Sequence, residues 1–205
     1  IVSSNEEKVS DAYELVSKIK NDILNLEIAT QDLIQDNYTL RLCEKTARDF
    51  GPILVSIAQL ATSLGTFSDL VRVVMEGIDN DDKDIPAFFE SKIILRRLDA
   101  IVLLLKNFAI WDEKKNDVFW IMKKRLAPGL KIDSSSSEYF VFTQTPLDIS
   151  SLMNRGVFEE MQTVICTSAT LRTGYNFNYW MNRTGVSYVE RERVICKDFA
   201  SPFPY

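Results

Sequence analysis

The residues best suited to chemistry lie near the C-terminal end of the chain, where small hydroxyl residues follow an apolar run. The run is Thr163–Cys166, and Thr167, Ser168, Ala169 and Thr170 come directly after it. A short run of apolar and β-branched residues is typical of a strand buried on both faces. In open α/β sheets, ligands bind beyond the carboxyl ends of the parallel strands. The pattern therefore predicts an inner strand whose hydroxyl tip contacts a substrate or another motif.

The same hydroxyl cluster has a simpler interpretation. Short hydroxyl side chains at a strand end often hydrogen-bond nearby backbone groups and have no further role. The cluster alone does not separate the two interpretations, and the choice depends on the motifs around it.

A second group of candidate residues is basic. Lys123, Lys124 and Arg125 follow an aromatic stretch, and Arg172 follows the hydroxyl cluster. Cations beside aromatic rings are typical of proteins that bind single-stranded nucleic acid, because the cations contact phosphates and the rings stack on bases. The alternative is ordinary solvated charge, and the formal net charge of −5 favours it. That charge also argues against a free-standing nucleic-acid binder, which relies on a basic field.

Several kinds of chemistry are excluded by residues that the chain lacks. It contains no histidine, so histidine-based acid–base catalysis and histidine-containing zinc sites are excluded. Cys43, Cys166 and Cys196 are odd in number and widely spaced, which predicts buried, reduced thiols rather than disulfides or metal ligands. There is no Gly-x-x-x-x-Gly-Lys-Ser/Thr loop and no Asp-Glu-Ala-His box, so we expect no ATP hydrolysis by this chain alone.

Three long helices are predicted from apolar residues that recur in alternating steps of three and four. They are expected at Ser4–Gln35, Leu40–Ile78 and Pro86–Trp111. Thr30 and Ser68 occupy positions in the apolar stripes of the first two. Pro52 lacks a backbone N–H and should kink the second helix. The third helix has the widest apolar face, so we expect it to be the most buried, and the acidic stretch Glu76–Asp84 before it lacks EF-hand spacing and is predicted to be a solvated loop.

After residue 112 the hydrophobic period becomes strand-like. Strands are expected at Val118–Met122, Tyr139–Thr143, Thr163–Cys166 and Arg193–Lys197, and helices at Ser150–Met161 and Tyr175–Arg183. Asp148 or Ser150 can cap the first of these helices, and Gly185 is expected to end the second. The first two strands should be neighbours, and the strand–helix–strand order that follows predicts parallel pairing with a right-handed crossover. The predicted fold class is α+β, with an elongated antiparallel bundle of three long helices over residues 1–112 and a partial α/β unit over residues 113–205.

Three stretches of the chain resemble motifs of one protein family. The stretch from Thr167 to Leu171 resembles motif III of the superfamily 2 helicases of the DinG/XPD branch, and Ala169 matches the bacterial DinG form. Thr145–Ser150 upstream and Ser201–Tyr205 downstream are further matches at family-like spacing, although Pro204 departs from the Ser-Pro-Phe-Asp-Tyr that is usual there. The matches cover the C-terminal part of the chain, and the N-terminal part is supported by its architecture.

The resemblance implies that the chain is part of an ATP-dependent DNA helicase that moves 5′ to 3′ on single-stranded DNA. Residues 1–112 would be the helical Arch, and residues 113–205 the later part of the first RecA-like motor domain. Thr167, Ser168 and Thr170 would relay hydrogen bonds between the acidic box and DNA without transferring protons. ATP and Mg²⁺ are implied for the full-length protein, the iron–sulfur cluster of the family would lie outside this chain, and we expect no cofactor on this piece itself.

The expected partners are single-stranded DNA and the remaining segments of the motor domain. We expect a cytoplasmic protein with no membrane partner, because no signal peptide or spanning apolar run is evident. An inner strand without neighbours has unpaired edges, so association of copies through Thr163–Cys166 is a further expectation. The alternative function is a non-enzymatic helical module that binds partner helices or dimerises through its apolar stripes.

Overall fold

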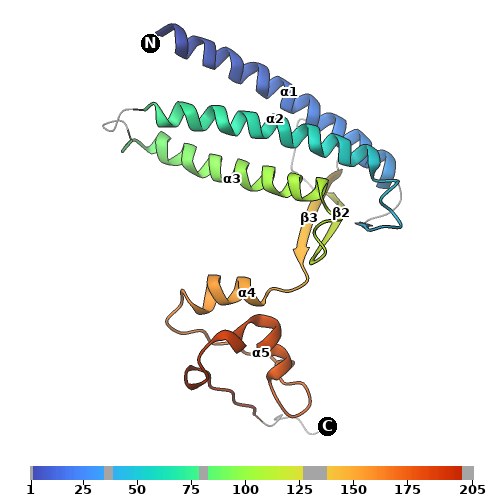
Figure 1. Cartoon of the computed structure of the whole chain (residues 1–205), viewed down its shortest axis with the longest axis vertical. Coiled ribbons are helices and arrows are strands. Elements are labelled where there is room, and N and C mark those ends of the chain that lie inside the picture. Colours follow the sequence, from blue (N-terminus) through green and yellow to red (C-terminus); the bar gives the residue numbers. More distant parts are fainter. Residues whose placement is uncertain (1, 35–38, 79–82, 127–137, 200–205) are drawn as a thin grey trace. The chain divides into compact units, whose positions relative to one another are not determined.

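The chain folds as two compact units and contains both helices and strands. The computed structural model describes residues 2–34, 39–78, 83–126 and 138–199 (Figure 1). The first unit is Ile1–Thr145 and the second is Pro146–Tyr205, and each is described by itself. The predicted α+β class is confirmed. Three sequence predictions lie partly or wholly outside the described residues: the acidic loop of residues 76–84, the connector between the two strands after residue 112, and the Ser201–Tyr205 motif.

Three long helices make up most of the first unit. They are α1 (Val2–Ile34), α2 (Gly51–Glu76) and α3 (Pro86–Ala109). Successive helices run antiparallel, and α2 packs against both of the others (Figure 1). The predicted polar positions in the apolar stripes are confirmed, because Thr30 and Ser68 are both buried. Thr30 Oγ1 donates to the backbone oxygen of Leu26 at 2.6 Å, so the hydroxyl is satisfied within its own helix.

A short strand replaces the expected beginning of the second helix. Strand β1 (Thr39–Leu42) pairs antiparallel with β2 (Asp117–Arg125), and Leu42 lies opposite Phe119. The prediction of one kinked helix over Leu40–Ile78 is therefore wrong at its N-terminal end. The alternation of polar and leucine residues in Thr-Leu-Arg-Leu is the period of a strand, and it was the signal for β1.

Helix α2 begins at Gly51, with Pro52 in its first turn rather than at a kink. Proline is favoured at that position because the first N–H groups of a helix have no partner inside it. The helical spacing before Gly51 has a local cause. The turn there contains hydrogen bonds of helical type, such as Ala47 N–H to the Cys43 oxygen at 2.8 Å, and it leads directly into α2, where Gly51 N–H donates to the Arg48 oxygen at 3.2 Å.

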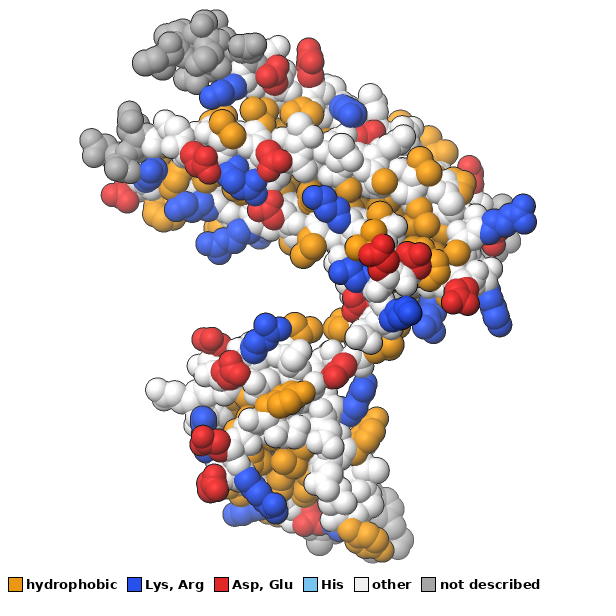
Figure 2. Space-filling view, in the orientation of Figure 1, with side chains coloured by type: hydrophobic (Ala, Val, Ile, Leu, Met, Phe, Trp, Pro, Cys, Tyr) orange, Lys and Arg blue, Asp and Glu red, His pale blue; other side chains and the backbone are white. Residues whose placement is uncertain are grey.

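The middle helix is the most buried of the three, which corrects the expectation for the third. The buried residues of α2 are Ile53, Ile57, Leu60, Ala61, Ser63, Leu64, Ser68 and Met75, whereas those of α3 are Phe88, Val102, Leu105 and Phe108. A helix with neighbours on two sides buries more of its circumference than a helix at the edge. The wide apolar face of α3 remains partly at the surface, and Figure 2 shows hydrophobic side chains exposed over the helices of the first unit. Ile93 and Ile94 of α3 are about half exposed.

The composition of α2 is also compatible with a membrane-spanning helix. Among the described residues, α2 is long and apolar enough to cross a membrane, judged by length and composition alone, although the sequence analysis expected no such run. A core helix of a water-soluble protein has the same composition. Its burial between α1 and α3 accounts for its apolar character.

The three-stranded sheet packs against the helices through aromatic residues. Its order is β1-β2-β3, where β3 is Glu138–Pro146, so the prediction that two strands after residue 112 are neighbours is confirmed. The Phe108 ring of α3 meets Phe119 of β2 edge-on, with ring centroids 4.9 Å apart, and meets Phe142 of β3 at 5.8 Å. Edge-to-face pairs of this kind add stability beyond the area that they bury.

A polar contact ties the same strands to α3. The Gln144 side chain accepts a hydrogen bond from Asn107 Nδ2 at 2.9 Å and donates one to Asp117 Oδ2 at 2.8 Å. The two strands thus belong to the helical unit, and the units divide between residues 145 and 146, whereas the sequence analysis placed the boundary between residues 112 and 113.

Two serine–aspartate hydrogen bonds link the three helices. Ser63 of α2 donates to Asp22 Oδ2 of α1 at 2.5 Å, and both residues are buried. Ser68 of α2 donates to Asp99 Oδ1 of α3 at 2.5 Å, and Arg72 reaches both oxygens of Asp99 at 3.1 Å. These bonds specify the register of α2 against each neighbour, because sliding α2 by one turn would leave the polar groups unpaired in the core.

Ser63→Ala is expected to destabilise the first unit by about 1–3 kcal/mol, because it leaves the buried Asp22 carboxylate without its donor. Thr62→Ala, at the neighbouring exposed position, is the control and should change stability little. Urea unfolding followed by circular dichroism measures both variants. Equal stability of the two would show that the Ser63–Asp22 bond contributes nothing.

The stability of the first unit should fall in acid partly through Asp99. The hydrogen bond from Ser68, and then the bond and charge of Arg72, hold the pKa of Asp99 below its ordinary value of 3.8. A carboxyl whose pKa is lower in the folded state stabilises the protein above the unfolded pKa, and that contribution is lost as the pH falls through the folded pKa. Asp99→Asn should therefore lose less stability than the wild type between about pH 6 and about pH 3. If the unfolding free energies of Asp99→Asn and the wild type fell equally over this pH range, the role assigned to Asp99 would be contradicted.

Candidate functional site

The second unit begins with a short helical segment. The unit as a whole comprises α4 (Ser150–Met153), the π-helical turn η2 (Asn154–Phe158), α5 (Asn178–Thr184), and the short 3₁₀ turns η3 (Val186–Tyr188) and η4 (Arg191–Arg193). The N-cap residue is Ile149, not the predicted Asp148 or Ser150, but Asp148 Oδ1 accepts the backbone N–H of Ser150 at 2.9 Å at the start of the helix. This bond is the main cause of a lowered pKa of Asp148, and the charge of Arg183 adds to it. The helical segment ends at Phe158, before the predicted Met161.

Gly185, at the end of α5, lies against the start of α4. It ends α5 with φ +81°, in the left-handed region, as predicted for a helix stop. A Cβ atom at this position would overlap the backbone oxygen of Ser150 at the start of α4. Glycine is therefore required both by the backbone conformation and by the close approach of α4.

The segment expected to be the inner strand is extended, exposed and unpaired. Residues 163–168 have no regular secondary structure, and Ile165 is 83% exposed. The prediction of a strand buried on both faces at Thr163–Cys166 is wrong, and so is the parallel crossover that depended on it. The predicted strand at Arg193–Lys197 is also absent, since η4 covers its first residue and the rest is irregular. An inner strand needs a paired strand on each side, and among the described residues these segments have none.

Most of Thr163–Cys166 lines a cavity within the second unit. Thr163, Val164 and Cys166 line this cavity of about 290 Å³, whereas Ile165 does not. Because Thr163 and Val164 are consecutive, the lining residues do not alternate as the side chains of a regular strand do. The apolar composition is therefore explained partly by this cavity and not by strand pairing.

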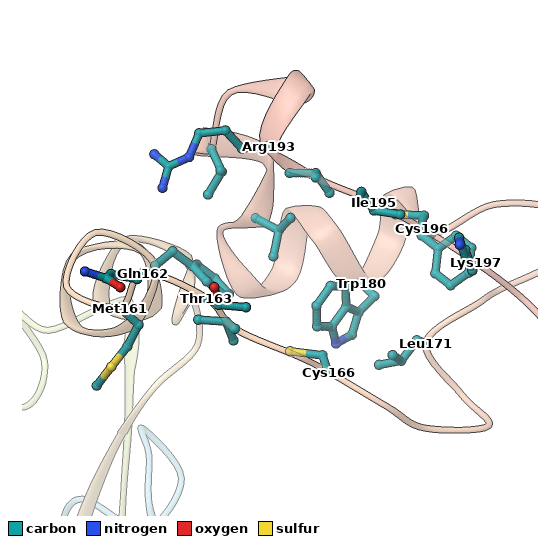
Figure 3. Close-up of a pocket in the computed structure, with 16 residues that line it drawn as sticks. Met161, Gln162, Thr163, Cys166, Leu171, Trp180, Arg193, Ile195, Cys196 and Lys197 are labelled. Atoms are coloured by element: carbon teal, nitrogen blue, oxygen red, sulfur yellow. The ribbon is translucent and has the colours of Figure 1, made fainter.

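The cavity lies beside α5. Trp180 of α5 points toward the space between two extended segments, one containing Cys166 and the other Ile195 and Cys196 (Figure 3). Leu171, the last residue of the hydroxyl motif, also lines it. The sequence analysis did not predict this cavity. The amphipathic pattern around Trp180 predicted a helix, but it did not show what the apolar face of that helix covers.

The hydroxyl motif forms an exposed turn after the extended segment. Ser168 Oγ lies 3.0 Å from Thr170 Oγ1 and accepts the backbone N–H of Thr170 at 3.2 Å. Thr167, Ser168, Ala169 and Thr170 are all exposed. The Ser168 hydroxyl thus satisfies a local backbone group, as the simpler interpretation expects. Because the turn is open to solvent, its hydroxyls are also accessible to another molecule.

The predicted basic residues lie on both units and are largely paired with carboxylates. Lys123 and Arg125 of β2 approach Glu138 of β3 at 3.6 and 3.4 Å. Arg172 pairs with Asp198 within the second unit. Lys124 is exposed. The paired carboxylates reduce the positive field that a phosphate would meet near Lys123, Arg125 and Arg172.

The three cysteines differ from the buried thiols that the sequence predicted. All are free, but Cys166 and Cys196 are exposed, and Cys43 is only partly buried. The hydrogen bond with the Thr46 side chain is the main cause of a lowered pKa of Cys43. Within the described ranges, no group of three side chains that could hold a metal ion is found.

No family model, curated protein or solved structure matches this chain.

Gly185→Ala is expected to destabilise the second unit by about 2 kcal/mol or more, because it combines left-handed strain with the overlap at Ser150. Gly156→Ala is the matched control, since a Cβ there meets open space. Amide hydrogen exchange should accelerate in α4 and α5 of the Gly185 variant and stay unchanged in α1–α3. Unchanged exchange in α4 and α5 would contradict the contact.

Proposed function

We propose that this chain is part of an ATP-dependent DNA helicase of the DinG type, with the three long helices as its Arch and the second unit as part of a RecA-like motor domain. The observation that carries the proposal is the motif from Thr167 to Leu171, whose hydroxyl residues form a solvent-exposed turn directly after an extended apolar segment. The order of the chain also supports it, because the helices precede the motif, as in the family that the sequence resembles.

The chemistry proposed for the motif is hydrogen bonding rather than proton transfer. A hydroxyl group donates one hydrogen bond and accepts two. Ser168 uses its acceptor capacity partly on the Thr170 N–H, and no described residue hydrogen-bonds the Thr167 side chain. Thr167 and Ser168 are therefore able to bond the acidic box of a motor domain and so sense its nucleotide, while Thr170 orients Ser168.

The unpaired segment before the motif also fits a motor domain. Thr163, Val164 and Cys166 line the cavity beside Trp180, whereas Ile165 is exposed. A strand with apolar residues on both faces is the kind found inside a parallel sheet. Neighbouring strands from other motor segments would pair with it and cover Ile165.

ATP and Mg²⁺ are assigned to other segments of the proposed protein. The chain contains no phosphate-cradling Gly-Lys loop, so its own residues do not fit the nucleotide. The alternative, a non-enzymatic helical module, is distinguished by the upstream coding sequence. A Walker A loop and an acidic box there would support the motor, and their absence would refute it.

In the full-length protein, Thr167→Ala combined with Ser168→Ala should uncouple ATP turnover from unwinding. ATP hydrolysis stimulated by single-stranded DNA should persist, while strand separation falls by about tenfold or more, because the hydroxyl relay is lost. Parallel ATPase and fluorescent unwinding assays measure the two activities. Thr173→Ala, an exposed threonine just after the motif, is the control, and unwinding by the double variant at the control rate would remove the assigned role.

A further inference from the structure

The outer face of α3 combines exposed aliphatic residues with basic residues. Its exposed apolar side chains, each about half exposed, are Phe89, Ile93, Ile94, Ile101 and Leu103. Figure 2 shows hydrophobic and basic side chains next to one another over this helix. Neither α1 nor the sheet covers this face among the described residues.

Three of these exposed apolar residues form a stripe together with Arg97, and Ile94 and Leu103 lie on either side of it. Phe89, Ile93, Arg97 and Ile101 follow one another in steps of four, so they lie along one side of the helix. At 1.5 Å per residue, the stripe is about 18 Å long, or more than three helical turns. A stripe of this length matches the apolar face of a second helix.

This face carries an excess of positive charge within the first unit, because Lys92, Arg96 and Arg97 outnumber the one exposed acid beside the stripe, Glu90. Arg96 and Arg97 are exposed and make no ion pair with a described carboxylate. Lys92 lies over the Phe88 ring, 4.5 Å from its centroid, and keeps its charge at the surface. The nearby Asp99 is already occupied by Ser68 and Arg72 of α2. A partner on this face therefore meets uncompensated cations.

We propose that the outer face of α3 binds an acidic amphipathic helix of a partner protein. Leucine-type side chains of that helix would pack on Ile93 and Ile101, and its Asp and Glu residues would pair with Arg96 and Arg97. The inference does not rest on the helicase proposal, because it depends only on the first unit.

Charge and side-chain type favour this occupant over the others. A second copy laid antiparallel on the stripe would bring the arginines of both copies together near its centre, and like charges repel. Single-stranded nucleic acid stacks on aromatic rings, but this face is mainly aliphatic, with Phe89 as its exposed ring. An acidic helix satisfies both the apolar and the basic residues.

The test is fluorescence anisotropy with the 205-residue chain and a labelled synthetic peptide of about 20 residues, with leucines at helical spacing and flanking glutamates. Saturable binding in the micromolar range is expected. The same peptide with lysines in place of the glutamates should not bind. Equal binding of the two peptides would overturn the assigned charge complementarity.

Variants locate the interaction. Ile93→Asp and the pair Arg96→Glu with Arg97→Glu should each weaken binding by about tenfold or more, with circular dichroism unchanged. Leu24→Asp, at a similarly exposed position of α1, is the control and should bind as the wild type does. Undiminished binding by the α3 variants would refute the proposal. The proposal would also be refuted if oligothymidine or anionic phospholipid vesicles displaced the peptide and bound the wild type but not the same α3 variants. The face would then bind nucleic acid or membrane.

Discussion

The first unit depends on the packing of α2 between two helices that do not cover each other. The side chains of α2 are apolar around much of its circumference, and packing against α1 and α3, which each cover a different side, stabilises the helix. Ile53 and Ile57 of α2, and Phe50 directly before it, are among the most deeply buried side chains of the described residues. The positions of the outer helices, and of the sheet beside them, follow from this two-sided burial.

Apolar packing alone would allow α2 to slide against its neighbours, and hydrogen bonds between side chains remove that freedom. The Ser63–Asp22 and Ser68–Asp99 bonds each couple one outer helix to one position along α2. At the end of α3, the ring of Phe108 packs edge-on against Phe119 of β2 and Phe142 of β3 and so holds the strands against the helix. The outer face of α3 takes part in none of these contacts, which is why its aliphatic residues remain in water.

The sequence predicted the local features better than the partners of each element. Pro86 and Gly185 mark helix ends through their own backbone chemistry, and both are found where expected. Asp148 bonds the start of its helix, although the N-cap residue is Ile149. Pro52 was misread because a proline in a periodic pattern signals either a kink or a helix start, and only the pairing of β1 with β2 decides between them. The relative burial of the helices also depends on arrangement and not on composition.

The candidate site shows the same division. β-branched residues in Thr163–Cys166 indicated a buried strand, but the segment is unpaired and exposed, because pairing depends on other strands, which local composition does not contain. The hydroxyl turn was identified from its residue types, whereas the local bond between Ser168 and Thr170 required the structure. The carboxylate partners of the basic residues are distant in sequence, as Arg172 and Asp198 show, so the pairing was not visible beforehand.

The contact of Gly185 with Ser150 has an entropic consequence for the hydroxyl motif. The motif lies between these two residues along the chain, so their contact closes a loop that contains it. The cost of closing a flexible loop rises only slowly with its length. The loop therefore tolerates insertions or altered residues far from its base, where the close approach at Gly185 and the hydrogen bond from Arg183 to the Leu147 oxygen hold its two ends together.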